Sequence, residues 1–359
     1  MGLVRDNIAS MKGYTPGEQP GDLSVIKLNT NENPYPPSPR VLEAVRSIAD
    51  EQLRRYPNPD AQMFRQAAAG VHGVDADWIM TTNGGDELLA LVFRACVGEG
   101  QAAAFLDPSY SLYPILGAMQ AAKQIVLPYQ ISGANWELPR EIFKLSARLL
   151  LIVNPNAPSG TFIDRETLSR IIGGFTGVVL IDEAYVDFAP DNALALVKKH
   201  ANLILLRSLS KGYSLAGLRF GYGIAQPELL RELNKVRDSY PCDVVAIAAA
   251  TAAIKDQDWA RKSWEAVRSE REMVCAQLGE WGFVIPPSSA NFILAQTPEG
   301  LSAGKLYEQL KARNILVRWF NLPRLTDKLR ITIGTPEQNR ALLTAIRELV
   351  AQPATAKNG

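Results

Sequence analysis

A lysine and an arginine that stand eight residues apart are the first candidates for chemistry. Lys211 and Arg219 belong to RSLSKGYSLAGLRFGYG, residues 207–223, which begins in an apolar run. A lysine at the inner end of a buried strand is poorly solvated, and this favours its neutral, nucleophilic amine. The cationic fork of an arginine suits a phosphate group. The spacing alone also fits a loop with two surface cations, so the chemistry needs further support.

Two more segments place polar groups where apolar runs end. In IDEAYVDF, Asp182 and Tyr185 end a strand, where a carboxylate is costly without a cation, although a helix N-cap is the alternative. In TTNGGDELL, Gly84 and Gly85 open an amphipathic helix whose backbone amides attract phosphate, although such glycines are often only turns. An amine, a carboxylate for a cationic ring nitrogen and a phosphate site together match the needs of pyridoxal phosphate.

The composition narrows the function class. The 359 residues carry 38 basic and 37 acidic side chains, and this balance argues against nucleic-acid binding. Two histidines and three scattered cysteines predict neither a metal site nor a disulfide framework. The first residues lack the apolar run of a secretory signal, and the eleven-residue run 244–254 is too short to span a bilayer, so we expect a buried helix there. We therefore expect a cytoplasmic enzyme that acts on small molecules, without membrane or nucleic-acid partners.

Strands and helices alternate in the first two thirds of the chain. Four apolar runs are typical of strands buried on both faces, and the periodic segments between them, such as 164–172, predict crossover helices and a parallel sheet. In such folds ligands bind at the carboxyl ends of the strands, where NPNAPSG, DEAY and SLSK all fall. The predicted strands lie within 102–107, 147–155, 177–185 and 202–210.

The two ends of the chain differ from this pattern. Residues 1–37 are predicted to be an extended arm, because 14–39 is rich in proline and glycine. Ser38 and Pro39 then indicate the start of a helix of about four turns with apolar residues to Leu53. A long charged helical stretch, 256–281, opens a segment of different character. We therefore expect a large α/β domain over 38–255 and a smaller α+β domain over 256–359.

The motifs together resemble a known family. The motifs SLSKGYSLAGLRFGYG, IDEAYVDF, NGGDELL, NPNAPSG and LRITIGT resemble those of the fold-type I pyridoxal-phosphate-dependent aminotransferases. LNTNENPYPPSP, RYPNPDA and ILVRWFNLPRLTDKLRITIGT are similar to the histidinol-phosphate group within that family. The resemblance covers essentially the whole chain. It implies a mostly parallel sheet flanked by helices in a large domain, with a smaller α+β domain.

The resemblance also implies roles around the cofactor. Lys211 would bond to the cofactor and carry the proton of the substrate's α-carbon. Asp182 would pair with the ring nitrogen and Tyr185 would hydrogen-bond the ring's phenolic oxygen. Tyr110 would stack on the ring, although a packing tyrosine is the simpler interpretation of that residue. The cofactor phosphate would be held by Gly84, Gly85, the backbone of Asp86, Ser208, Ser210, Arg219 and, from a neighbouring subunit, Tyr56.

Substrate binding and assembly follow in the same way. Arg318 and Arg330 would receive the substrate's anion, since bidentate arginines discriminate phosphate and carboxylate well, although solvated surface charge is the commoner fate of arginine. Tyr14 and Asn29 would complete the pocket. A tyrosine supplied by a neighbour implies a homodimer.

One position departs from the family. The asparagine that usually precedes Pro-Thr-Gly and hydrogen-bonds the cofactor's phenolic oxygen is Ala157 here, in NPNAPSG. Either Asn156 takes over the contact or Tyr185 carries it alone. The loss of a donor to this oxygen would raise the pKa of the lysine–cofactor imine.

The resulting hypothesis is an amino-group transfer between L-histidinol phosphate and 2-oxoglutarate in histidine biosynthesis. An aromatic aminotransferase or a threonine-phosphate decarboxylase of the same family is the alternative, because the cofactor motifs are shared. A non-catalytic regulatory protein that keeps the fold is the alternative from another class. The lack of a helix-turn-helix pattern before residue 40 and the balanced charge argue against it.

Overall fold

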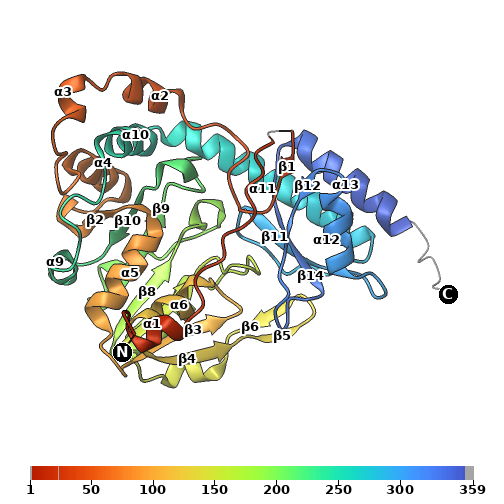
Figure 1. Cartoon of the computed structure of the whole chain (residues 1–359), viewed down its shortest axis with the longest axis horizontal. Coiled ribbons are helices and arrows are strands. Elements are labelled where there is room, and N and C mark those ends of the chain that lie inside the picture. Colours follow the sequence, from red (N-terminus) through yellow and green to blue (C-terminus); the bar gives the residue numbers. More distant parts are fainter. Residues whose placement is uncertain (1, 23, 352–359) are drawn as a thin grey trace.

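The computed structural model describes residues 2–22 and 24–351, and a seven-stranded sheet dominates its larger part (Figure 1). The strand order is β2-β10-β9-β8-β7-β3-β4, and all neighbours are parallel except that β10 runs antiparallel to β2 and β9. The four predicted strands and their parallel arrangement are confirmed. The strands are β2 (Ile79–Thr82), β3 (Ala102–Asp107), β4 (Lys123–Pro128), β7 (Leu149–Val153), β8 (Val178–Asp182), β9 (Leu203–Ser208) and β10 (Gly221–Ile224).

Helices cover both faces of this sheet, because alternate strand residues point to opposite sides. Ala104 and Ile152 share a core with α4, α7, α8 and α10, whereas Phe105 and Leu151 share another with α5, α6 and α9. The predicted buried helix over 244–254 is confirmed as α10. The bounds are α4 (Gln62–His72), α5 (Gly84–Cys96), α6 (Leu112–Met119), α7 (Arg165–Gly174), α8 (Leu194–Val197), α9 (Pro227–Asn234) and α10 (Val244–Lys255).

The chain after residue 256 packs around a third core and a three-stranded sheet of order β11-β14-β13. The predicted long charged helix is confirmed as α11. On the strength of this separate core, we propose that 38–255 and 256–359 are two domains. The elements are α11 (Gln257–Glu280), β11 (Phe292–Gln296), α12 (Ala303–Lys311), β12 (Ile315–Leu316), β13 (Arg318–Trp319), β14 (Lys328–Thr332) and α13 (Pro336–Ala351).

The N-terminal segment crosses from the large sheet to this second part (Figure 1). It is mostly extended, as expected, but begins with the short helix α1 (Asp6–Ser10), and its strand β1 (Ile26–Lys27) pairs in parallel with β12. The side chain of Leu28 is buried in the third core. The segment therefore links both parts of the molecule. A small hairpin of β5 (Gln130–Ser132) and β6 (Asn135–Glu137) follows β4.

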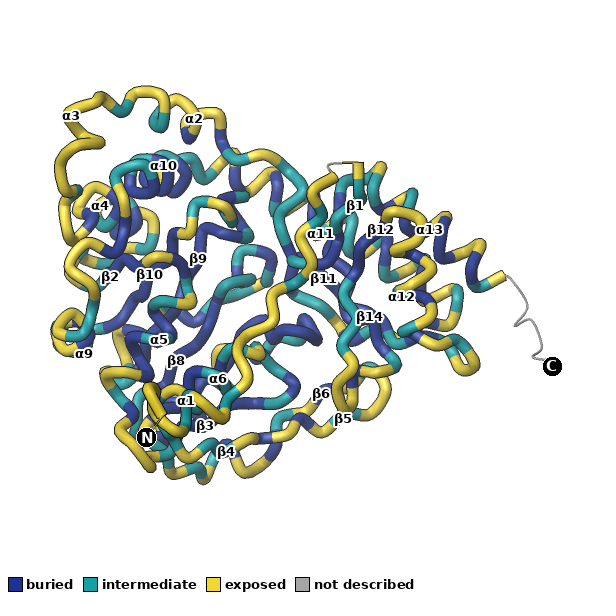
Figure 2. The backbone as a smooth tube through the Cα atoms, viewed as in Figure 1, coloured by how far each residue is buried: buried dark blue, intermediate teal, exposed yellow. Residues whose placement is uncertain are grey.

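The prediction of one helix of about four turns after Ser38 is wrong. Ser38 does cap a helix, with its Oγ accepting from the Arg40 amide at 3.2 Å, but α2 (Pro39–Arg46) ends early and a separate α3 (Asp50–Leu53) follows. Ala49 between them is extended, which breaks the common face. Leu42 and Leu53 are 52% and 61% exposed. Figure 2 shows this region as one of the most exposed stretches of the molecule.

Short 3-10 helices complete the fold at η1 (Ala76–Trp78), η2 (Arg140–Lys144), η3 (Val186–Phe188) and η4 (Ala216–Leu218). Across the described residues, no helix combines the length and apolar character needed to cross a membrane.

Candidate active site

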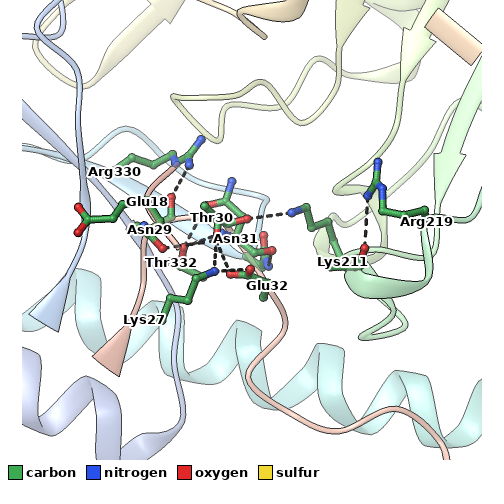
Figure 3. Close-up of polar contacts among 12 residues, drawn as sticks. Glu18, Lys27, Asn29, Thr30, Asn31, Glu32, Lys211, Arg219, Arg330 and Thr332 are labelled. Carbon is green, nitrogen blue, oxygen red and sulfur yellow. Dashed lines mark hydrogen bonds and ion pairs between the residues drawn. The ribbon is translucent and has the colours of Figure 1, made fainter. Parts of the chain in front are cut away.

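Lys211 lies just beyond the carboxyl end of β9, with its amine turned toward the N-terminal segment. Its Nζ donates to the carbonyl oxygen of Thr30 at 2.9 Å (Figure 3). The pKa of Lys211 is lowered to about 8, mainly by burial and also by the nearby cations Arg330, Lys27 and Arg219, against the attraction of Glu32. At this pKa roughly a tenth of the amine is neutral at pH 7, far more than for a lysine in water, and the neutral form is the one that attacks a carbonyl carbon.

Asp182 ends β8 and is buried. Its Oδ1 accepts from the Ala184 amide at 3.0 Å and its Oδ2 accepts from the Tyr113 hydroxyl at 3.2 Å. Burial raises the pKa of Asp182 to about 7, and within the described part of the chain no cationic side chain pairs with it. The following helix, η3, has Tyr185 at its N-cap position, so Asp182 is not a helix N-cap. This carboxylate suits a ligand that brings its own positive charge.

Tyr185 lies close enough to Asp182 for that carboxylate to raise its pKa, and Tyr110 lies close to Tyr185 in turn. The hydroxyl oxygen of Tyr185 accepts from Asn31 Nδ2 at 3.0 Å, and its ring meets Phe292 edge-on. The Tyr110 hydroxyl donates to Asp86 Oδ1 at 3.0 Å. The Tyr110 ring also lies edge-on to Tyr14, with centroids 6.3 Å apart. Aromatic faces therefore border the site, and the stacking role of Tyr110 stays a prediction.

The start of α5 forms a site suited to an anion. Gly84 has a φ of +76°, and a Cβ there would lie 2.7 Å from Arg219 Nη2. Only glycine therefore lets the arginine fork approach the first backbone amides of the helix. A Cβ on Gly221 would lie 2.6 Å from the carbonyl carbon of Gly84, so β10 needs glycine for the same close approach. The guanidinium and the helix start converge, as a phosphate requires.

Polar groups from β9 and α5 complete this cradle. Ser208 and Ser210 are buried, and the Ser208 Oγ accepts from the Ser210 amide at 3.1 Å. Gly85 packs beside Leu206 of β9. The Asp86 carboxylate, which we expected to contribute only its backbone, pairs with Arg219 Nη2 at 3.5 Å. This contact holds the guanidinium over the helix start.

Arg318 and Arg330 lie opposite each other in the register of β13 and β14. Arg330 Nη2 donates to the Asn29 carbonyl oxygen at 2.7 Å, while its buried Nε has no hydrogen-bond partner. Burial lowers the pKa of Arg330. Both guanidinium groups lie over the ring of Phe320, at 5.3 and 5.5 Å from its centroid. Neither guanidinium group has a carboxylate partner in the described chain, so the pair is suited to an anion.

Asn29 and Tyr14, the other two residues predicted to contact the substrate, lie in the N-terminal segment. Asn29 Nδ2 donates to the Glu18 carbonyl oxygen at 2.8 Å, so its link to the site runs through its own carbonyl and Arg330. Tyr14 is 44% exposed beside Tyr110. Tyr56 is 80% exposed and stacks on Tyr240 with centroids 4.4 Å apart, away from the groups above. Its contribution to a neighbouring subunit stays a prediction.

Asn156, beside the unusual Ala157, is fully buried. Its Nδ2 donates to the Pro108 carbonyl oxygen at 3.2 Å and to Ser159 Oγ at 2.8 Å. Both amide hydrogens are thus already used, which favours Tyr185 as the donor to the cofactor's phenolic oxygen.

Sequence reasoning missed part of the site. Tyr113, which donates to Asp182, was not singled out. The segment 30–32 passes between Lys211 on one side and Arg330 on the other (Figure 3). Its Glu32 forms an ion pair with Lys27 and attracts the Lys211 amine. The polar string LNTNENP was a visible signal, but only Asn29 was taken from it.

The residues present fit pyridoxal phosphate. A poorly solvated amine, a buried carboxylate without a cation and a glycine-lined cradle with an arginine match the aldehyde, the ring nitrogen and the phosphate of that molecule.

Comparison with known proteins agrees with this geometry. A model of the family "Aminotransferase class I and II" matches residues 24–346. Histidinol-phosphate aminotransferase 1 of Trichormus variabilis is 47% identical over 96% of this chain and 98% of its own length. Histidinol-phosphate aminotransferase of Citrifermentans bemidjiense is 44% identical over 96% and 98%.

A solved structure has the same fold. Histidinol-phosphate aminotransferase from Sinorhizobium meliloti, in complex with pyridoxal-5'-phosphate, superimposes with a TM-score of 0.87 at 24% identity and covers 98% of both chains. The residues that meet at the strand ends and the match over most of the chain lead to one conclusion: the chain belongs to the class I and II aminotransferases.

Proposed function

We propose that this protein is a histidinol-phosphate aminotransferase. It transfers the amino group of L-histidinol phosphate to 2-oxoglutarate, and it forms imidazole-acetol phosphate and L-glutamate in histidine biosynthesis. The paired Arg318 and Arg330 carry this proposal, because they offer two cations without a carboxylate partner in the described chain, and Arg330 lies close enough to lower the pKa of Lys211. The names of relatives that are 44–47% identical over nearly the whole chain support it.

Each side chain then has a defined task. Bound pyridoxal phosphate supplies an electron sink for the pair released when the substrate's α-carbon loses its proton. Lys211 Nζ accepts and returns that proton, and its lowered pKa keeps the amine partly neutral for this purpose. Asp182 keeps a positive charge at the ring nitrogen through its buried carboxylate. Tyr185 offers its hydroxyl proton to the phenolic oxygen, and Tyr110 covers the ring.

Two anion sites separate the cofactor from the substrate. Gly84, Gly85, the Asp86 amide, Ser208, Ser210 and Arg219 hold the cofactor phosphate. Arg318 and Arg330 bind the phosphate of histidinol phosphate in one half-reaction and a carboxylate of 2-oxoglutarate in the other, since guanidinium forks suit both groups. Tyr14 and Asn29 border this second site.

We also propose that the protein is a homodimer with shared sites. The apolar side chains of Leu42, Leu53 and Met63 are exposed on α2, α3 and α4, and Tyr56 and Tyr240 are exposed as well. A second chain that covers them would bring Tyr56 toward the partner's cofactor phosphate. An obligate interface needs such an apolar patch.

The three cysteines are free thiols, as a cytoplasmic location predicts.

The substrate assay decides between the family members. The purified protein with pyridoxal phosphate is incubated with 2-oxoglutarate and either L-histidinol phosphate or an aromatic amino acid, and glutamate formation is measured. We expect kcat/KM for histidinol phosphate to be at least about tenfold higher. A tenfold preference in the other direction would contradict the proposal. Release of carbon dioxide from threonine phosphate without use of an oxo-acid would identify the decarboxylase.

A non-catalytic role is tested separately. The wild-type protein should change the absorbance of added pyridoxal phosphate from that of the free aldehyde to that of a lysine-bound form, and Lys211→Ala should leave the free-aldehyde spectrum. An identical spectrum for both proteins would refute a role of Lys211 in cofactor binding.

A further inference from the structure

We propose that Asn31 is a positioning residue that directs the hydroxyl proton of Tyr185 toward the cofactor, and so takes over part of the task of the asparagine that Ala157 replaces. The inference rests on the proposed function, because it concerns the same cofactor site. It starts from one contact, in which Asn31 Nδ2 donates to the hydroxyl oxygen of Tyr185 at 3.0 Å.

The amide of Asn31 is held in a single orientation. Its backbone N–H donates to Thr332 Oγ1 at 3.0 Å, and the Thr332 hydroxyl donates to Asn31 Oδ1 at 3.0 Å. The carbonyl oxygen of Asn31 accepts from Asn291 Nδ2 at 3.0 Å. With the amide reversed, the buried Thr332 hydroxyl proton would lose Oδ1, its acceptor among the described residues, so this orientation, with Nδ2 toward Tyr185, satisfies more of the buried polar groups. The side chain is 1% exposed, so no solvent competes for these groups.

This orientation decides what Tyr185 can do. A phenolic hydroxyl has one proton, and its oxygen is occupied here as an acceptor from Asn31. The Tyr185 proton therefore does not point at Asn31 and is available as a donor on another side. A hydroxyl that accepts one hydrogen bond also becomes a stronger donor in the next. With alanine at 157 and both Asn156 hydrogens used, this proton is the donor that remains for the phenolic oxygen.

The backbone at Asn31 supports the assignment. Its φ is +59°, in the left-handed region that asparagine and glycine tolerate better than other residues. The preceding residue, Thr30, offers its carbonyl oxygen to Lys211 Nζ. The same turn of the arm thus contacts both Lys211 and Tyr185.

Other ionisable groups also face Tyr185, and the experiment must separate their influence. Burial raises the pKa of Tyr185, Arg330 and the Asn31 hydrogen bond oppose this, and Asp182 and Tyr14 add to it. Tyr110 and Tyr113 lie close enough to be influenced by Tyr185 in turn.

The test follows the visible absorbance of the cofactor-loaded protein as a function of pH, without substrate. A weaker donor to the phenolic oxygen raises the pH midpoint of the absorbance change, because the deprotonated form loses a hydrogen bond. Asn31→Gly keeps the left-handed backbone and removes the amide, and we expect its midpoint to rise by about one pH unit. Asn31→Asp places an acceptor against Tyr185 and should raise the midpoint at least as far. If Asn31→Gly does not fold, the titration of Asn31→Asp tests the proposal in its place.

Two comparisons make the result specific. Asn314 is an exposed asparagine with a φ of +60°, so Asn314→Gly is a matched control and should leave the midpoint unchanged. In a Tyr185→Phe background, which itself raises the midpoint, Asn31→Gly should have no further effect.

Two outcomes would overturn the proposal. One is an unchanged midpoint in both Asn31 variants, while Tyr185→Phe shifts it. The other is an equal shift by Asn31→Gly with tyrosine or phenylalanine at 185. The titration uses no substrate, so a wrong substrate in the proposed function would leave its result intact.

Discussion

Arg318 on β13 and Arg330 on β14 are directly paired across two antiparallel strands. Directly opposed residues project from the same face of a sheet, so the two guanidinium groups lie side by side. Like charges in this position repel each other and destabilise the sheet. An anion between or above the two guanidinium groups would relieve this repulsion. This pair is the basis for the proposed substrate site.

Loss of either arginine should weaken substrate binding and leave the cofactor in place. For Arg330→Gln we expect KM for histidinol phosphate to rise about 10- to 100-fold, because charged hydrogen bonds contribute about 1.5–3 kcal/mol each. Arg318→Gln should raise KM as well, and in the absence of ligand it should not lower the melting temperature, since it removes a like-charge contact. Steady-state kinetics and thermal unfolding measure the two effects. A KM within twofold of wild type in both variants would exclude this substrate site.

Lys211→Met should abolish transamination and stabilise the cofactor-free protein at pH 7. Burial lowers the pKa of Lys211 from 10.5 to about 8, so the folded protein carries a disfavoured ammonium group below pH 8. The unfolded chain binds more protons than the folded one between about pH 8 and 10.5. The free energy of unfolding of the wild-type protein therefore rises with pH over that range, and the advantage of the variant becomes smaller. We therefore expect the difference in melting temperature to be largest below pH 8 and to shrink toward pH 10. A constant difference over this range would contradict the lowered pKa.

Asp182→Asn should make the cofactor-free protein more stable at pH 8 and at the same time lower kcat. The pKa of Asp182 is raised from 3.8 to about 7 in the folded protein, so its buried carboxylate costs stability as pH rises from about 4 to 7. The cofactor-free variant should therefore melt higher than wild type at pH 8 and equally near pH 4. Its kcat should fall about 100- to 1,000-fold, since a group that stabilises developing charge is lost. Added pyridoxal phosphate should stabilise the variant less than wild type.

Gly212→Ala should destabilise the loop that carries Lys211. A Cβ on Gly212 would overlap the carboxylate of Asp187, and the Gly212 carbonyl oxygen already accepts from Trp264 Nε1 at 2.6 Å. Overpacking of this kind costs about 1–3 kcal/mol in the free energy of unfolding. Gly217→Ala, which adds a methyl group in open space, is the matched control and should be nearly neutral. Urea titration of both variants measures the difference, and equal midpoints would refute the overlap.

Hybrid dimers test the proposed role of Tyr56. Tyr56→Ala and Lys211→Ala are each expected to be poorly active alone. After exchange of subunits, the hybrid has one complete site, in which Lys211 of one chain meets Tyr56 of the other. Random exchange makes half of the dimers hybrid, so about a quarter of wild-type activity should return. If mixing restores no activity although exchange is complete, Tyr56 does not serve a neighbouring site.

Much of this protein was determined by the sequence alone, because the physics involved is local. Apolar runs such as 149–153 predicted buried strands, since their side chains must leave water on both faces. The polar residues directly after these runs, Asp182 and Lys211, were correctly expected at the carboxyl ends of parallel strands. The helix after Ser38 was predicted too long, because periodicity did not reveal that Ala49 is extended.

The tertiary structure decided how distant segments meet. Asn31 contacts Tyr185 across 154 positions, Lys211 contacts Thr30 across 181, and Arg330 contacts Asn29 across 301. No periodicity or propensity encodes these pairs, because they depend on where the arm crosses between the two parts of the molecule. The sequence therefore determined which groups carry the chemistry. Only packing determined which neighbours shift the pKa of Lys211 and in which direction the hydroxyl proton of Tyr185 points.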